Sequence, residues 1–157
     1  MNIFNRLFNN NNSNNTKECP RCLGKGNVDW DDIKRLNQEL KWIPGKCAYC
    51  NGKGTVENSI ENNVPVDASY LVLNLEEAER KKILEGDHDA IERGKLHENS
   101  VDNFINQIAY LYFEGGLTPL QISKFFLIGN DDSDNYEKEQ QDMIDYVEKV
   151  VEKRSKN

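Results

Sequence analysis

Apolar residues in the second half of the chain recur every three or four positions, which is the spacing of a helix that buries one face. The clearest stretch contains Val101, Ile105 and Ile108. A further stretch, from about residue 133 to 153, also places its apolar residues on one stripe. These patterns predict a helical domain over residues 74–157.

Helix start signals divide this half into separate helices. Thr118 precedes Pro119 and is followed by Gln121, a pattern in which the side chains bond the first free backbone N–H groups of a helix. Asn74 and Asp87 are the expected caps of two shorter helices nearer the middle of the chain. We therefore expect several short helices, packed together through their apolar faces.

The first half of the chain has weaker patterns. Residues 29–43 place apolar side chains at helical spacing and predict one helix. Residues 59–73 combine β-branched and aromatic residues with a proline, and they predict an extended connector. Residues 1–16 contain a short apolar stripe and then a run of asparagines. Because such a run has no apolar surface to bury, it predicts a disordered tail.

Length and charge narrow the classes of protein to consider. A chain of 157 residues holds one ordinary domain or two small ones, which excludes an enzyme built on a large barrel. The net charge of -7 is uneven, because residues 17–57 are slightly basic and the residues from 58 onward are strongly acidic. This balance argues against binding of a phosphate backbone by the chain as a whole. We find no apolar run of about 18 residues and no signal-peptide core, and we expect a cytoplasmic protein without a membrane span.

The four cysteines occur in two matching stretches. Residues 19–26 and residues 47–54 both read CxxCxGxG, and each ends in Gly-Lys-Gly. Each CxxC can form a tight turn that directs two sulfur atoms to one point, and two such turns complete a tetrahedral zinc site. The predicted ligands of one structural zinc ion are Cys19, Cys22, Cys47 and Cys50. The glycines suit the sharp turn after the second cysteine of each pair.

Two other uses of CxxC remain as alternatives. A CxxC can be a redox-active pair, and four cysteines can form two structural disulfides. A redox motif is expected once, after a strand, whereas this motif occurs twice with the same glycines. Disulfides need an oxidising compartment, and no export signal is visible. The sequence therefore favours zinc.

The doubled CxxCxGxG motif resembles the cysteine-rich zinc finger of DnaJ-type chaperones. The resemblance covers residues 19–54, about a quarter of the chain. In that family four repeats form two zinc sites on a module that contacts other proteins, whereas the two repeats here suffice for one site. The His-Pro-Asp tripeptide of the J domain is missing. The resemblance implies a DnaJ-like zinc finger over residues 17–58 and a role in binding proteins. The helix that the apolar spacing predicts over residues 29–43 is an insertion that departs from the bare finger of that family.

The function expected from these observations is not enzymatic. A site with four cysteine ligands leaves no open coordination position, and the sequence contains no phosphate-binding loop and no GxSxG motif. We expect a protein-interaction adaptor or a chaperone-like factor that binds another protein. The alternative is a nucleic-acid-binding regulator, which would use the basic residues around the cysteines. Those residues are Arg21, Lys25, Lys46 and Lys53.

Overall fold

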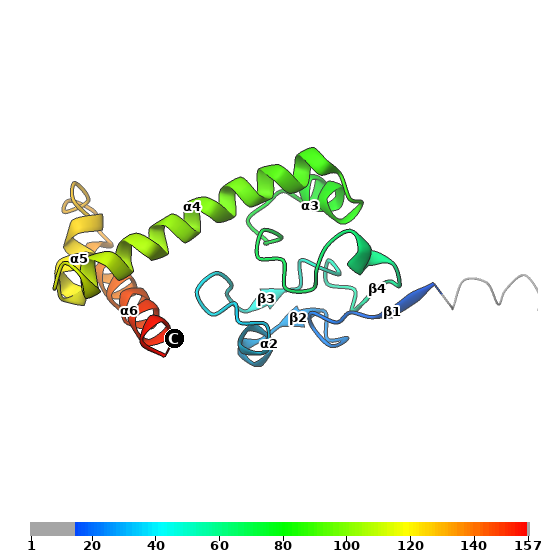
Figure 1. Ribbon diagram of the computed structural model, residues 1–157, viewed down its shortest axis with the longest axis horizontal. Coiled ribbons are helices and arrows are strands. Elements are labelled where there is room, and N and C mark those ends of the chain that lie inside the picture. Colours follow the sequence, from blue (N-terminus) through cyan, green and yellow to red (C-terminus); the bar gives the residue numbers. More distant parts are fainter. Residues whose placement is uncertain (1–14, 157) are drawn as a thin grey trace, which may run out of the picture. The chain divides into compact units, whose positions relative to one another are not determined.

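The computed structural model describes residues 15–156, so most of the predicted tail, residues 1–16, lies outside the described part of the chain. The described residues form two compact units, one that reaches to Glu98 and one that begins at Asn99 (Figure 1). The secondary structure is mainly helical, with two small antiparallel sheets in the first unit.

Four short strands frame the cysteines of the first unit. They are β1 (Thr16–Glu18), β2 (Asn27–Val28), β3 (Gly45–Lys46) and β4 (Thr55–Glu57). Strand β1 pairs with β4, with Lys17 opposite Val56. Strand β2 pairs with β3, with Asn27 opposite Lys46. The first CxxC lies between β1 and β2 and the second between β3 and β4, so the two sheets hold the cysteine turns side by side.

The helix predicted over residues 29–43 is much shorter in the structure. Helix α2 covers only Trp30–Arg35. It begins with a capping box, in which Asp29 accepts from the backbone N–H of Asp32 and the Asp32 side chain accepts from that of Asp29. It ends because Asn37 takes a left-handed backbone conformation, with φ of 57°, which an α-helix cannot continue. The remaining apolar residues of this segment lie in turns or irregular loop.

The segment predicted as an extended connector, residues 59–73, is also different. It contains the 3-10 helix η1 (Ile60–Asn62), followed by turns, and it forms no strand. Val64 and Leu71 are fully buried in the same core as the cysteines. This segment and the chain up to residue 98 therefore belong to the compact unit of the cysteine module.

The next two helices, α3 and α4, have bounds that differ from those predicted. Helix α3 covers Glu77–Leu84, and its N-cap is Glu76 rather than the predicted Asn74. Helix α4 covers His88–Phe113 as one continuous helix, where the sequence suggested two. Asp87 begins it as predicted, because its carboxylate accepts a 3.0 Å bond from the backbone N–H of residue 90.

The second unit consists of the last part of α4, α5 (Pro119–Phe126) and α6 (Tyr136–Ser155). The predicted start of α5 is confirmed, because Thr118 and Gln121 form a capping box. The fully buried side chains of this unit are Ile108, Ile122, Ser123, Val147 and Val150. Among residues 15–156, no helix is both long enough and apolar enough to cross a membrane.

Candidate metal centre

The structure brings the four cysteines to one point. The Sγ atoms of Cys19 and Cys47 are 3.8 Å apart, and those of Cys22 and Cys50 are also 3.8 Å apart. All four Sγ atoms lie within 4.8 Å of one another, and all four residues are buried. Among residues 15–156, this is the one group of three or more His, Cys, Asp or Glu side chains close enough together to hold a metal ion.

The sulfur spacing fits a tetrahedral metal ion. A zinc ion with Zn–S bonds of about 2.3 Å at tetrahedral angles places its sulfur ligands about 3.8 Å apart. A disulfide would place two sulfurs about 2.05 Å apart, and all four cysteines are free thiols here. The donor set of four thiols also suits a soft or borderline metal. The residues present therefore fit a closed, four-coordinate metal site.

Backbone N–H groups point at two of the sulfurs. The N–H of Gly26 donates to Sγ of Cys22 at 3.2 Å, and the N–H of Gly54 donates to Sγ of Cys50 at 3.2 Å. Such bonds spread the charge of a metal-bound thiolate and orient the ligand. The same bond occurs at the same place in both repeats, so the glycine at the end of each motif has a defined task.

These two glycines also have no room for a side chain. Gly26 and Gly54 have φ of 78° and 82°, in the left-handed region. A Cβ atom on Gly26 would lie 2.5 Å from the carbonyl oxygen of Gly52, and one on Gly54 would lie 2.5 Å from that of Gly24. The two repeats therefore pack backbone against backbone, and the last glycine of each motif permits this approach.

The thiols influence one another strongly. The contact with Cys47 lowers the pKa of Cys19 to about 5. The same contact, together with burial, raises the pKa of Cys47. Four buried thiols this close together cannot all ionise without a cation, because like charges repel in a medium of low polarity. A bound dication removes this obstacle, so metal binding would release protons from the cluster.

Arg21, which lies between the first two cysteines, is buried. It is only 2% exposed, and its guanidinium donates to three backbone carbonyl groups. Nε bonds Val66 at 2.9 Å, Nη1 bonds Leu71 at 2.9 Å and Nη2 bonds Ala68 at 3.0 Å. One side chain of the first repeat thus fixes the turns of residues 66–71 onto the cysteine module. The planar fork of arginine suits this task, which the single ammonium of lysine cannot perform in the same way.

The equivalent residue of the second repeat holds the same segment. Tyr49 lies 28 positions after Arg21, and its hydroxyl donates a 2.7 Å bond to the carbonyl of Val64. The Arg21 guanidinium lies 5.1 Å from the centre of the Tyr49 ring and 4.2 Å from that of Trp42. Both distances are within the range of cation–π attraction.

The charge of Arg21 also suits a metal centre. Burial lowers the pKa of Arg21 to about 10, while the groups of Cys47, Tyr49 and Cys19 act in the opposite direction. Arg21 is therefore cationic at neutral pH. A zinc ion with four thiolates carries a formal charge of -2, so a buried cation beside it offsets part of that charge.

The exposed basic rim expected around the cysteines is therefore smaller than the sequence indicated. Arg21 is internal, and Lys25 forms ion pairs with Asp29 at 2.6 Å and Asp32 at 2.7 Å. The bond from Lys25 also lowers the pKa of Asp29 to about 2. Lys46 and Lys53 are exposed. The position of Arg21 between two cysteines of a closed site was the available signal that it would be buried.

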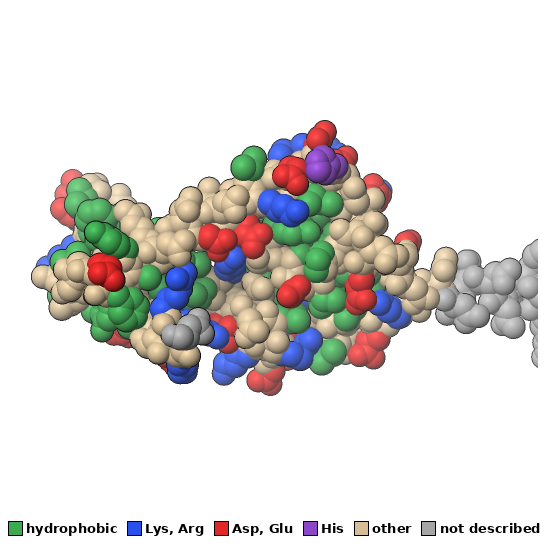
Figure 2. Space-filling view, viewed as in Figure 1, with side chains coloured by type: hydrophobic (Ala, Val, Ile, Leu, Met, Phe, Trp, Pro, Cys, Tyr) green, Lys and Arg blue, Asp and Glu red, His purple; other side chains and the backbone are tan. Residues whose placement is uncertain are grey.

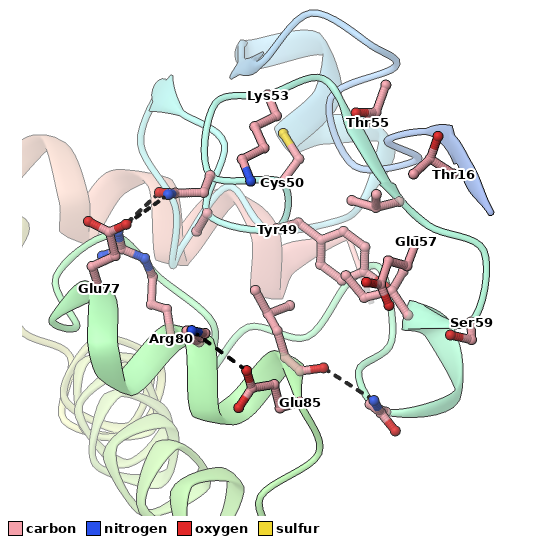
Figure 3. Close-up of a pocket in the computed structure, with 17 residues that line it drawn as sticks. Thr16, Tyr49, Cys50, Lys53, Thr55, Glu57, Ser59, Glu77, Arg80 and Glu85 are labelled. Atoms are coloured by element: carbon pink, nitrogen blue, oxygen red, sulfur yellow. Dashed lines mark hydrogen bonds and ion pairs between the residues drawn. The ribbon is translucent and has the colours of Figure 1, made fainter. Parts of the chain in front are cut away.

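A cavity of about 690 Å³ lies beside the second repeat (Figure 3). Tyr49 and Cys50 line one side of it, and the other side is lined by Glu77 and Arg80 of α3 and by Glu85, which caps the end of that helix. Asn51 bridges the two sides by donating to the carboxylate of Glu77 at 3.0 Å. Sequence reasoning did not find this cavity, because α3 lies far from the cysteines along the chain. Since a candidate metal ligand is part of its wall, the shape of the cavity depends on the metal centre.

The comparisons with known proteins assign no family. No family model matches the chain, and no curated protein and no solved structure matches it. What the structure establishes is a cluster of four buried cysteines that can hold a metal ion, in a mainly helical protein.

Proposed function

We propose that this chain is a cytoplasmic, non-enzymatic zinc protein that acts as a protein-interaction adaptor or chaperone-like factor. The observation that carries the proposal is the cluster of four buried sulfurs, all within 4.8 Å of one another. With four cysteine ligands a zinc ion has no open position for substrate or water, so its role is structural. The doubled CxxCxGxG motif supports a DnaJ-like finger as the form of this site.

Surface features of the first unit support protein binding. Leu23 follows the first cysteine pair directly and is 51% exposed, and Ile43 is 78% exposed. The cavity between the second repeat and α3 has both apolar and charged lining residues, including Ile60, Leu84 and Lys53. Apolar side chains and a concave surface beside a rigid metal centre are suited to a protein partner.

Nucleic-acid binding is the weaker proposal. A groove that follows a phosphate backbone needs several free cations. Of the four basic residues considered, Arg21 bonds backbone carbonyl groups inside the unit and Lys25 is paired with two carboxylates. Only Lys46 and Lys53 remain for that role, which would give weak and strongly salt-dependent binding.

A metal assay tests the centre directly. We expect one zinc ion per chain in protein purified without chelator, and cobalt substitution should give the absorption of a tetrahedral cobalt–thiolate site. Cys22→Ser should lose the metal. Leu23→Ser, which changes an exposed neighbour that is not a ligand, should retain it. Absence of zinc from the unaltered protein, or retention of zinc by Cys22→Ser, would contradict the proposal.

A binding assay tests the adaptor role. We expect the zinc-loaded chain to retain a protein partner from cytoplasmic extract and Cys22→Ser to lose it. Repeating the assay without residues 1–15 shows whether the N-terminal segment contributes. A nuclease-sensitive complex, or tight binding of single-stranded RNA at physiological salt, would favour the nucleic-acid alternative instead.

A further inference from the structure

The outer face of α5, in the second unit, carries exposed apolar side chains. Leu120, Phe125 and Ile128 are 45%, 46% and 77% exposed, although the same helix buries Ile122 in the core. Figure 2 shows hydrophobic side chains gathered over α5. Leu120 and Phe125 lie on α5 itself, and Ile128 lies in the turn just past its last residue, Phe126, so the three form an apolar ridge over the helix and its C-terminal turn. Such a ridge fits the groove between side chains of another helix.

This α5 ridge is held in place by the unit itself. The capping box of Thr118 and Gln121 fixes the start of the helix. The ring of Phe125 contacts that of Phe126 edge-on, with 5.2 Å between centres, and Phe126 contacts Phe104 in the same way at 4.8 Å. A surface that is ordered before binding loses little conformational entropy when a partner arrives.

Ile128 has no evident task within the unit. The buried apolar residue at the end of α5 is Leu127, and the chain then turns at Gly129, which has φ of 91°. Ile128 lies between them and extends into solvent. A large apolar side chain at such a place gains free energy only when another surface covers it.

Charge indicates what covers the ridge. The loop that follows Ile128 contains Asp131, Asp132 and Asp134, and none of these carboxylates forms an ion pair within residues 15–156. They lie near the C-terminal end of α5, where the helix dipole is also negative. The second unit as a whole has five more acidic than basic residues. Its field therefore attracts a cationic partner and repels nucleic acids and anionic membranes.

We propose that the α5 ridge is a docking site for a basic amphipathic helix of another protein. The apolar face of that helix covers Leu120, Phe125 and Ile128, and Lys or Arg residues at one of its ends face the acidic loop. Opposite Lys124 the partner carries a polar acceptor. This docking site rests on the proposed adaptor role in one respect, namely that the chain binds another protein. It adds the class of that partner, a basic amphipathic helix.

The probe for this proposal is a fluorescein-labelled synthetic peptide of about five helical turns. Leucines at helical spacing form its apolar face. Near one end of the peptide, the positions that are not leucine are lysine. A matched peptide has glutamate in place of every lysine. Fluorescence anisotropy with the full chain should show binding of the lysine peptide, weakening as salt is added, and no binding of the glutamate peptide.

Substitutions locate the contact. Ile128→Ser should weaken binding roughly tenfold, since it removes a side chain that the partner covers. Asp131→Asn combined with Asp132→Asn and Asp134→Asn should weaken it several-fold at low salt and little at high salt. Leu96→Ser, which removes a 66% exposed leucine from the first unit, should have no effect. The helical circular dichroism of each variant should match that of the parent.

Any of four results would overturn the docking site, the fourth being a failure of the lysine peptide to bind. One is equal binding of both peptides, and another is Ile128→Ser binding as tightly as the parent. The third is a dimer of the chain that is lost in Ile128→Ser, because the ridge would then be covered by a second copy. Zinc content is measured in parallel. Failed peptide binding with one zinc per chain overturns the ridge alone, whereas peptide binding without zinc overturns the metal centre alone.

Discussion

The two cysteine repeats share one backbone and differ in their side chains. Cys22 and Cys50 accept the same N–H bond at the same distance, and the backbone N–H of Cys19 bonds Gly54 as that of Cys47 bonds Gly26, at 2.8 and 2.9 Å. Two copies of one motif, 28 positions apart, thus make two equal halves of a metal site. The similarity lies in what faces the metal.

The difference lies in what faces away from it. Between the cysteines the first repeat has Arg21 and the second has Tyr49. Both side chains bond backbone carbonyl groups of residues 64–71, but arginine makes three such bonds and tyrosine makes one. The comparison separates two tasks. The repeated residues hold the metal, and the residues that are not repeated attach the rest of the first unit to it.

Loss of one ligand should have the largest effect, and it should be equal in the two repeats. We expect Cys22→Ser and Cys50→Ser each to lose the zinc ion and unfold the first unit, because structural zinc contributes about 10–16 kcal/mol to such small modules. Both tryptophans, Trp30 and Trp42, lie in that unit, so tryptophan fluorescence follows it alone.

The second unit provides the internal control for this experiment. Hydrogen exchange should show α5 and α6 still protected in both serine variants, while α3 loses its protection with the cysteine module. Protection of α3 in Cys22→Ser would show that the core of the first unit forms without the metal. Unequal behaviour of the two serine variants would contradict the equivalence of the repeats.

The last glycine of each motif should be the next most sensitive position. Gly26→Ala and Gly54→Ala each place a methyl group against a backbone oxygen at a left-handed residue, which should cost roughly 4 kcal/mol. Gly116→Ala is the matched control, since Gly116 also has a left-handed φ but nothing within 4 Å of its Cβ position. It should cost about 1 kcal/mol. Chemical denaturation of the zinc-loaded proteins measures all three, and equal losses would show that the close approach of the repeats is unimportant.

The parts of the fold that local chemistry determines could be predicted from the sequence. The capping box at Thr118 produced α5 where expected, and Asp87 begins a helix as expected. The helix over residues 29–43 could not be given its true length. The apolar spacing continues past Arg35, but the left-handed conformation of Asn37 is decided by the packing of the turns that follow. Long-range packing also determines that residues 59–73 join the core of the first unit.

The candidate site divides in the same way. The two CxxC turns are local, so the sequence could indicate that their four sulfurs meet. The environment of Arg21 is not local, because its three acceptors lie 45 to 50 positions further along the chain. Composition alone treats arginine as a surface cation. No spacing rule connects it to carbonyl groups of residues 66–71, and the cavity beside α3 was hidden for the same reason.

Substitutions of Arg21 and Tyr49, the equivalent residues that differ between the repeats, should lower the stability of the first unit by different amounts. Arg21→Lys keeps the charge but loses the fork that serves three carbonyl groups, and it should cost about 3 kcal/mol. Tyr49→Phe removes one buried bond to Val64 and should cost about 1.5 kcal/mol. Both variants should still bind one zinc ion, because neither changes a ligand. Thermal unfolding of the zinc-loaded proteins tests the order, and loss of zinc from Arg21→Lys would mean that this arginine supports the metal itself.

The smallest effect is expected where the repeats have the same residue in different surroundings. Lys25 and Lys53 are equivalent positions, but Lys25 pairs with Asp29 and with the buried Asp32, whereas Lys53 forms no ion pair within the described chain. Lys25→Ala should lower the melting temperature by less than Tyr49→Phe does, and Lys53→Ala should leave it unchanged.

Salt separates the two contacts of Lys25. The pair with Asp29 is exposed on both sides, so about 1 M salt should screen it almost fully. The pair with Asp32 has one partner out of reach of solvent ions and should persist. A part of the Lys25→Ala effect should therefore remain at high salt. If the whole Lys25→Ala effect disappeared at high salt, the ion pair of Asp32 with Arg35, at 3.3 Å, would suffice to stabilise that buried carboxylate. Lys25 would then contribute no more to stability at high salt than Lys53 does.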